Sequence, residues 1–236
     1  MKRHAVFTVA CLSSLITVGL SLPSSASTKP FSKQSASKIL TVSAAAVEAE
    51  GSTRVTSLET FSNGTNWSSV LDSAPHTSTQ TGHGSGGREL VLVIGSQVFI
   101  YGNETYYLSA TGLEKAKYVD RWVELTSTSS LYHSNQSGEL LKSLAQSVFQ
   151  LSNSKNDGLV KYRGHEVIKI SGQLPTSSAA PGSPQTVYIS DVAPYLPVAY
   201  TLRVSSDDEA IKATATFSKW GEKVSVAAPT TFITAS

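Results

Sequence analysis

The side chains that could do chemistry in this 236-residue chain are scattered rather than clustered. Beyond the N-terminal segment the histidines are His76, His83, His133 and His165, and no two of them have the short spacing of a zinc-binding pair. The one cysteine, Cys11, lies in an N-terminal apolar stretch. Because a zinc site needs several converging nitrogen, sulfur or carboxylate ligands, the sequence predicts neither a metal nor a cofactor.

The sequence also lacks a recognisable nucleophile. Ser85 lies between Gly84 and Gly86, but the surrounding residues do not form the Gly-x-Ser-x-Gly turn between a strand and a helix. A Ser-His-Asp triad can be built from residues that are far apart in sequence, so an exported serine hydrolase remains a less favoured alternative. The acidic run 207–209 (DDE) is interpreted as a solvated turn in preference to a calcium site. We expect a protein without enzymatic activity.

The N-terminus has the features of a secretory signal peptide over residues 1–26. A basic start at 2–4 (KRH) precedes the uncharged apolar stretch 5–22, and small residues up to Ala26 provide a cleavage site. An uncleaved membrane anchor is the alternative, because the apolar stretch is close to the length that spans a bilayer. Cys11 follows a partial lipidation motif, but Thr8 stands where leucine is usual, so we predict no lipid anchor there.

Charge and composition then limit the possible partners. Removal of Lys2 and Arg3 from the 19 basic residues leaves 17, against 17 acidic residues, so the exported chain is formally neutral. A neutral surface gives no electrostatic reason to expect nucleic acid as a partner. Residues 27–38 are rich in serine and lysine and predict a flexible lead-in, and residues 39–236 show no composition shift that would divide a single domain.

The order of predicted elements favours an α+β fold. Helices are expected at 39–50, ended by Gly51, and at 137–151, while the polar stretch 62–87 is interpreted as a long loop that is either a lid or disordered. Because strands and helices do not alternate regularly, we expect one antiparallel sheet with helices on one face. The predicted strands are 53–61, 89–94, 97–101, 105–108, 118–125 (or a crossing segment), 159–163, 165–171, 186–190, 198–204, 211–220 and 223–227.

The strands near the C-terminus have one apolar face. The face of 198–204 and 211–217 that we expect to be buried carries Val198, Tyr200, Leu202, Val204, Ile211, Ala213, Ala215 and Phe217. The small side chains of Ala213 and Ala215 beside large aromatic ones leave room either for a guest molecule or for a helix packed closely on the sheet. The pattern alone does not decide between these two explanations.

Several short runs together resemble the envelope lipid carriers of the LppX/LprG type, which belong to the LolA (lipoprotein-localisation factor) superfamily. They are 117–123 (KYVDRWV), 188–191 (YISD), 196–198 (LPV) and 217–221 (FSKWG), followed by Pro229, and the resemblance spans about 39–232. It implies a strongly curved antiparallel half-barrel with helices covering its concave face. Between sheet and helices such proteins hold acyl chains, without a catalytic residue. Many relatives carry a lipidated cysteine after the signal peptide, where this chain has Ser27.

The resemblance therefore implies a non-catalytic protein that binds or carries a lipid, a lipoglycan or another lipidated molecule at the bacterial cell envelope. An envelope sensor of the same fold, with a membrane protein as partner, is the alternative. We assign the expected ligand cavity from the strand faces and from the apolar stripe of 137–151. Its expected lining is Ile168, Ile170, Val187, Ile189, Val198, Tyr200, Leu202, Ala213, Ala215, Phe217, Leu144 and Val148.

Overall fold

The computed structural model describes residues 30–107, 116–138, 140–178, 180–205 and 210–235. The predicted signal peptide over 1–26, including Cys11, and residues 27–29 of the predicted lead-in lie outside this part of the chain. The acidic run 207–209 also lies outside it.

Helix α1 (Ala36–Glu50) confirms the helix predicted over 39–50 and begins three residues before it. The side chain of Ser35 caps its first turn by accepting a hydrogen bond from the backbone N–H of Lys38 at 3.3 Å. Gly51 ends the helix with a φ of 74°, a left-handed conformation that glycine adopts without steric cost.

The segment before α1 is more ordered than the sequence predicts. A short 3-10 helix, η1 (Phe31–Lys33), forms within the predicted flexible lead-in 27–38. Ser32 is buried, and the ring of Phe31 stacks on that of Tyr195 with 3.8 Å between the ring centroids. Contacts with a distant loop therefore hold the start of this segment against the rest of the fold, while the division into a flexible lead-in and a single domain stays a prediction.

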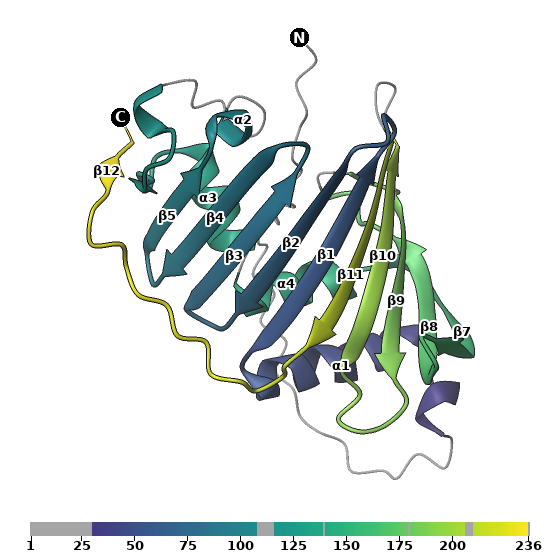
Figure 1. The fold of residues 1–236 in the computed structure, drawn as a ribbon. Coiled ribbons are helices and arrows are strands. Elements are labelled where there is room, and N and C mark those ends of the chain that lie inside the picture. The colour runs from purple at the N-terminus through teal and green to yellow at the C-terminus, as the bar shows by residue number, and fades with distance from the viewer. Residues whose placement is uncertain (1–29, 108–115, 139, 179, 206–209, 236) are drawn as a thin grey trace.

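The described residues form one open, strongly curved, twelve-stranded sheet with the order β12-β6-β5-β4-β3-β2-β1-β11-β10-β9-β8-β7 (Figure 1). Neighbouring strands are antiparallel except β12 and β6, which are parallel. In the middle, β1 pairs with both β2 and β11 and so joins the first and last parts of the chain. The strands are β1 (Thr53–Phe61), β2 (Asn66–Ser73), β3 (Thr77–Gly84), β4 (Gly87–Ile94), β5 (Gln97–Gly102), β6 (Val123–Glu124), β7 (Ser152–Tyr162), β8 (His165–Gln173), β9 (Pro184–Ser190), β10 (Pro197–Ser205), β11 (Ala210–Ser218) and β12 (Ile233–Thr234).

The prediction of a long loop over 62–87 is wrong, because β2 and β3 occupy most of this segment. These strands are polar because one of their faces is exposed and the other carries small residues beside a few large ones. Trp67 and Leu71 are buried on the inward side of β2, and Gly82 is buried on β3. The hydrophobic signal is therefore sparse, and pairing with β1 and β4 decides that the segment is extended.

Two further segments have a different secondary structure from the one predicted. The helix expected over 137–151 is divided into α3 (Ser130–Gly138) and α4 (Leu141–Phe149). The strand expected at 105–108 begins as the helical turn α2 (Glu104–Tyr106), because the side chain of Asn103 accepts a hydrogen bond from the backbone N–H of Tyr106 at 3.2 Å. Residue 108 itself lies outside the described part of the chain.

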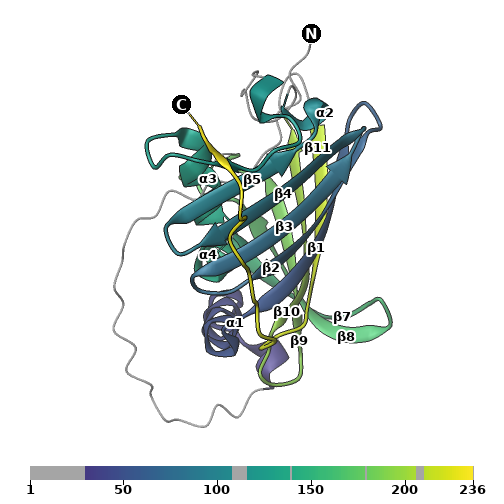
Figure 2. The ribbon, with the colours of Figure 1, turned by 60° about the vertical axis from the view of Figure 1, so that its left-hand side comes forward.

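The strand expected over 223–227 is absent from the described residues. Residues 219–232 instead run as coil from the end of β11 to β12 (Figures 1 and 2). Both edges of β11 are already paired, with β1 and β10, so the following residues find no free sheet edge there.

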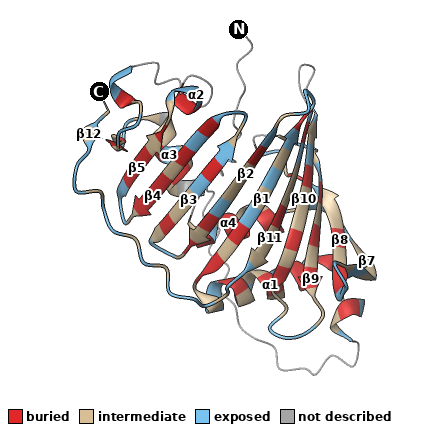
Figure 3. Cartoon of the chain, in the orientation of Figure 1, coloured by how far each residue is buried: buried red, intermediate tan, exposed pale blue. Residues whose placement is uncertain are grey.

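Two apolar clusters hold the helices against one face of the sheet (Figures 2 and 3). We call this the inner face; it carries Val55, Leu71 and Ala215. The first of these clusters, which we call the β8–β9 cluster, joins the inner face to α1 and α4. These two helices also pack against each other. The second, which we call the β4–β5 cluster, joins the inner face to α2, α3 and the short helix η3 (Ala116–Tyr118).

Candidate functional site

The inner face changes character from its flanks to its centre. On the flanks, Ile168, Ile170, Val91 and Val98 each have 0% of their surface exposed, because helices lie over them. Across β1, β2, β3, β10 and β11 the inner face is mixed: Val55, Leu71 and Ala215 are buried, but other inner-facing side chains are only half-buried. We call six of the half-buried residues the central inner face: Ser57, Glu59, Ser69, Gln80, Tyr200 and Ala213.

The structure brings most of the predicted cavity residues together. Seven are buried in the β8–β9 cluster and two are half-buried against it: Leu144, Val148, Ile168, Ile170, Val187, Ile189 and Ala215, then Tyr200 and Phe217. Leu202 is buried and Ala213 half-buried outside both clusters. Val198 is half-buried at a β-bulge between Pro197 and Ala199, where the regular alternation of faces is interrupted.

The two small residues of β11 have different surroundings. Ala215 is 1% exposed and lies in the cluster that contains α1 and α4, so its small side chain allows helices to approach the sheet. Ala213 keeps accessible surface beside Glu59, with which it is paired across the strands. A closely packed helix therefore explains Ala215, while Ala213 is only half-buried.

A groove of about 600 Å³ runs between α1, α4 and the start of β7. Beneath it a small cavity of about 10 Å³ lies between the helices and the sheet. Ala145 and Phe149 line both spaces and so separate the groove from the interior. The groove is lined by Ser37, Leu40, Thr41, Ala44, Ala45, Glu48, Ala145, Gln146, Phe149, Gln150, Leu151, Ser152, Ser154 and Pro175.

Two acidic residues interrupt the apolar inner face: Glu59 on β1 and Glu89 on β4. Glu89 is 3% exposed; its Oε1 accepts a hydrogen bond from Gln80 Nε2 at 2.8 Å, and its carboxyl is also hydrogen-bonded by Tyr106. Glu59 Oε2 is buried and accepts no hydrogen bond from the described residues. Burial, together with the charge of Glu89, raises the pKa of Glu59 to about 7. Burial also raises the pKa of Glu89 above its ordinary value.

The absence of a side chain at Gly82 makes the positions of Glu89 and Trp67 possible. A Cβ atom at Gly82 would lie 2.6 Å from Glu89 Oε1 and 2.8 Å from Trp67 Cζ2. The missing side chain therefore lets the carboxyl of Glu89 and the indole of Trp67 lie flat against the sheet.

Sequence reasoning missed Glu59 and Glu89, although the sequence contained a signal for both. Glu59 is two residues from Phe61 and has the strand parity of Val55, while Glu89 has the parity of Val91. Strand alternation therefore places both carboxyls on an apolar face.

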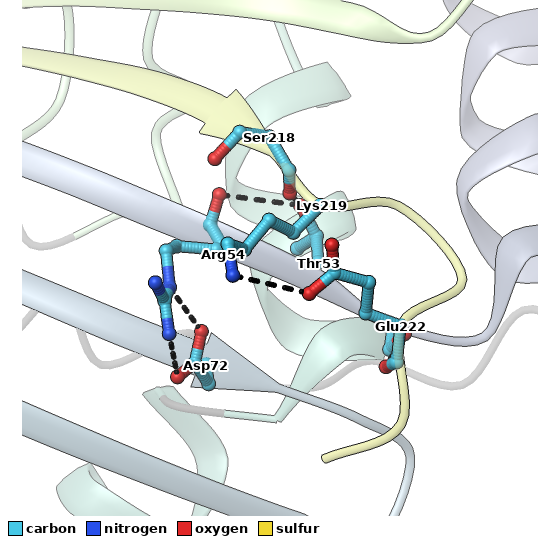
Figure 4. Close-up of polar contacts among 7 residues, drawn as sticks. Thr53, Arg54, Asp72, Ser218, Lys219 and Glu222 are labelled. Carbon is cyan, nitrogen blue, oxygen red and sulfur yellow. Dashed lines mark hydrogen bonds and ion pairs between the residues drawn. The ribbon is translucent and has the colours of Figure 1, made fainter.

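A second polar group lies on the opposite face, where the chain leaves β11 (Figure 4). The guanidinium of Arg54 binds both carboxylate oxygens of Asp72, at 2.6 and 2.7 Å. Lys219 Nζ lies 3.2 Å from Glu222 Oε2, and Thr53 Oγ1 donates to the backbone oxygen of Ser218 at 3.1 Å. A pocket of about 220 Å³ adjoins these residues. The first ion pair joins β1 to β2, and the second lies within the coil 219–232. The coil is fastened to the residue before β1, because Ser52 Oγ donates a hydrogen bond to the backbone oxygen of Glu222 at 2.6 Å.

The histidines lie on separate elements. His76 is in the turn between β2 and β3, His83 is on β3, His133 is on α3 and His165 begins β8. Within the described ranges, no group of three His, Cys, Asp or Glu residues is arranged to hold a metal ion. The same part of the chain contains no helix that is both long and apolar enough to cross a bilayer.

Comparison with known proteins connects this architecture to solved structures. No family model and no curated protein matches the chain. The crystal structure of the lipoprotein LppX from Mycobacterium tuberculosis aligns with a TM-score of 0.54 and 20% identity, covering 81% of this chain and 98% of LppX. LprF from Mycobacterium bovis aligns with a TM-score of 0.49 and 17% identity, covering 82% of this chain and 96% of LprF. The alignment with LppX shows a shared fold, so the predicted LppX/LprG-type fold is confirmed.

Proposed function

We propose that this protein binds the acyl chains of a lipid or lipidated molecule between the inner face of its sheet and its helices, without catalysing a reaction. The observation that carries this proposal is the difference between the flanks and the centre of the inner face. Apolar side chains are fully covered on both flanks, while the central inner face keeps accessible surface between them. The curved sheet would present this surface as the concave lining of a cavity beneath the helices.

The driving force would be the removal of hydrocarbon from water. Each buried methylene contributes about 0.8 kcal/mol, so a chain of ten carbons supplies enough free energy for measurable binding. The groove between α1 and α4 provides an entrance, and its volume of about 600 Å³ is typical of small-molecule sites. Ala145 and Phe149, both on α4, separate the groove from the small cavity beneath it. Small shifts of α4 would therefore connect the groove with this cavity.

We further propose that binding takes place outside the cytoplasm, at the cell envelope, with the protein acting as a carrier. The predicted signal peptide over 1–26 and the resemblance to LppX/LprG-type carriers support this location and role. The shared fold with LppX, a lipoprotein, agrees with both.

The test is uptake of lipid by delipidated protein, measured by native mass spectrometry after incubation with envelope lipids. A stoichiometric bound lipid is expected for the wild type. Ala44→Trp, which narrows the groove, should reduce uptake by about tenfold or more, while Ala49→Trp, on an exposed position of the same helix, should not. Thermal unfolding of both variants checks that they fold. A wild-type protein that takes up no amphiphile would refute the proposed function.

A further inference from the structure

In β1–β5 and β9–β11, the charged side chains of the inner face all have the same sign. Glu59 and Glu89 are the described charged residues of these strands that point inward, as the strand register shows. The cationic side chains of these strands point to the opposite face: Arg54, His83, Arg88, Arg203 and Lys212. On the described parts of the helices, the lysines are exposed.

One oxygen of the Glu59 carboxyl, Oε2, therefore lacks a hydrogen-bonding partner among the described residues. This oxygen is buried, and the neighbouring charge, Glu89, repels the carboxyl. A buried acceptor left without a donor is costly, and a buried carboxylate without a counter-charge is more so. A ligand at the central inner face can remove the cost of the unpaired acceptor only if it brings a hydrogen-bonding group there.

We propose that Glu59 and Glu89 make the inner face selective for amphiphiles whose polar group is uncharged and carries a hydroxyl, and that they exclude amphiphiles with a carboxylate or phosphate at this position. The inference rests on the proposed function, which it extends from acyl chains to the class of polar group. A hydroxyl suits either state of Glu59: it donates to the carboxylate and accepts from the carboxylic acid. An anionic group would instead add a negative charge to a buried region that has two carboxyls and no cation.

The experiment compares two probes of equal chain length, 1-decanol and decanoate, by isothermal titration calorimetry with delipidated protein at pH 7.5. Wild-type protein should bind decanol more tightly. An apolar pocket alone would also disfavour the carboxylate, so the informative variant is Glu59→Gln. This change keeps the shape of the side chain and removes its charge. It should strengthen decanoate binding about tenfold. This is the change in affinity expected if the repulsion between the two charges has the free energy of one pKa unit.

Glu166→Gln, on an exposed position of β8, is the matched control and should leave both affinities unchanged. Glu89→Gln is a second variant that keeps a partner for Gln80, and it should also strengthen decanoate binding. If decanol and decanoate bind and Glu59→Gln changes neither, the selectivity is refuted while the proposed function stands. If neither probe binds the wild type, the proposed function fails and the selectivity fails with it.

Discussion

Replacement of Glu59 by glutamine should change how the stability of the protein depends on pH. The pKa of this carboxyl is raised from 4.5 to about 7 by burial and by the charge of Glu89. Between these two values the folded protein holds a proton that the unfolded chain has released. The contribution of Glu59 to the free energy of unfolding must therefore be highest below about pH 4.5 and fall as the pH rises towards 7.

The size of this effect follows from the shift. One pKa unit corresponds to about 1.4 kcal/mol, so the ionised carboxyl of Glu59 costs the folded state about 3 kcal/mol above pH 7. Glutamine has a similar shape and cannot ionise. Glu59→Gln should therefore match the wild type in stability near pH 4.5 and exceed it by about 3 kcal/mol at pH 8.5. Part of this gain in stability comes from Glu89, whose carboxyl is no longer repelled by a charge at position 59, because coupled carboxyls titrate as a pair.

The assay is urea unfolding of both proteins at several pH values from 4.5 to 8.5, followed by circular dichroism. The quantity of interest is the difference between the two free energies of unfolding. Glu166→Gln, at an exposed site, is the control and should give a nearly constant difference from the wild type. If the wild type and Glu59→Gln give parallel profiles across this range, Glu59 is not a buried, uncompensated carboxyl and the reasoning is wrong.

Three further substitutions test the packing of the fold by urea unfolding. Ile168→Ala removes a side chain that is 0% exposed in the β8–β9 cluster and should cost about 2–5 kcal/mol; a cost below 1 kcal/mol would mean that this cluster is loosely packed. Gly82→Ala places a Cβ within 3 Å of two side chains and should cost about 1–3 kcal/mol, whereas an unchanged stability would show that both side chains can move away. A double-mutant cycle of Arg54→Ala and Asp72→Ala should give a coupling of about 0.2–1 kcal/mol that weakens in high salt, because both side chains are partly exposed; a salt-independent coupling would contradict this.

Strand alternation and turn residues predicted much of the fold. The hairpin around Gly95 and Ser96 joins β4 and β5 as expected, and β1 has the predicted bounds of 53–61. The resemblance identified the LppX/LprG-type fold, which the alignment with LppX confirms. These features were predictable because local periodicity and turn chemistry carry them.

Other elements were not predictable because their signal is not local. The polar strands β2 and β3 are held by pairing with β1 and β4 rather than by a hydrophobic pattern of their own. The run 223–227 has the alternation of a strand but follows β11, whose two edges are already occupied. In both cases the availability of a partner strand outweighs local preference.

By itself, the sequence determined which residues share a strand face: it places Glu59 with Phe61, Glu89 with Val91, and Ala213 with Ala215. Only the tertiary structure decided what each of these residues meets. It covers Ala215 with helices and leaves Ala213 accessible, and it brings the carboxyls of Glu59 and Glu89 close enough to interact. The physical reason is that alternation fixes only the direction of a side chain. Its burial, its pKa and the space beside it depend on neighbours that other strands and helices supply.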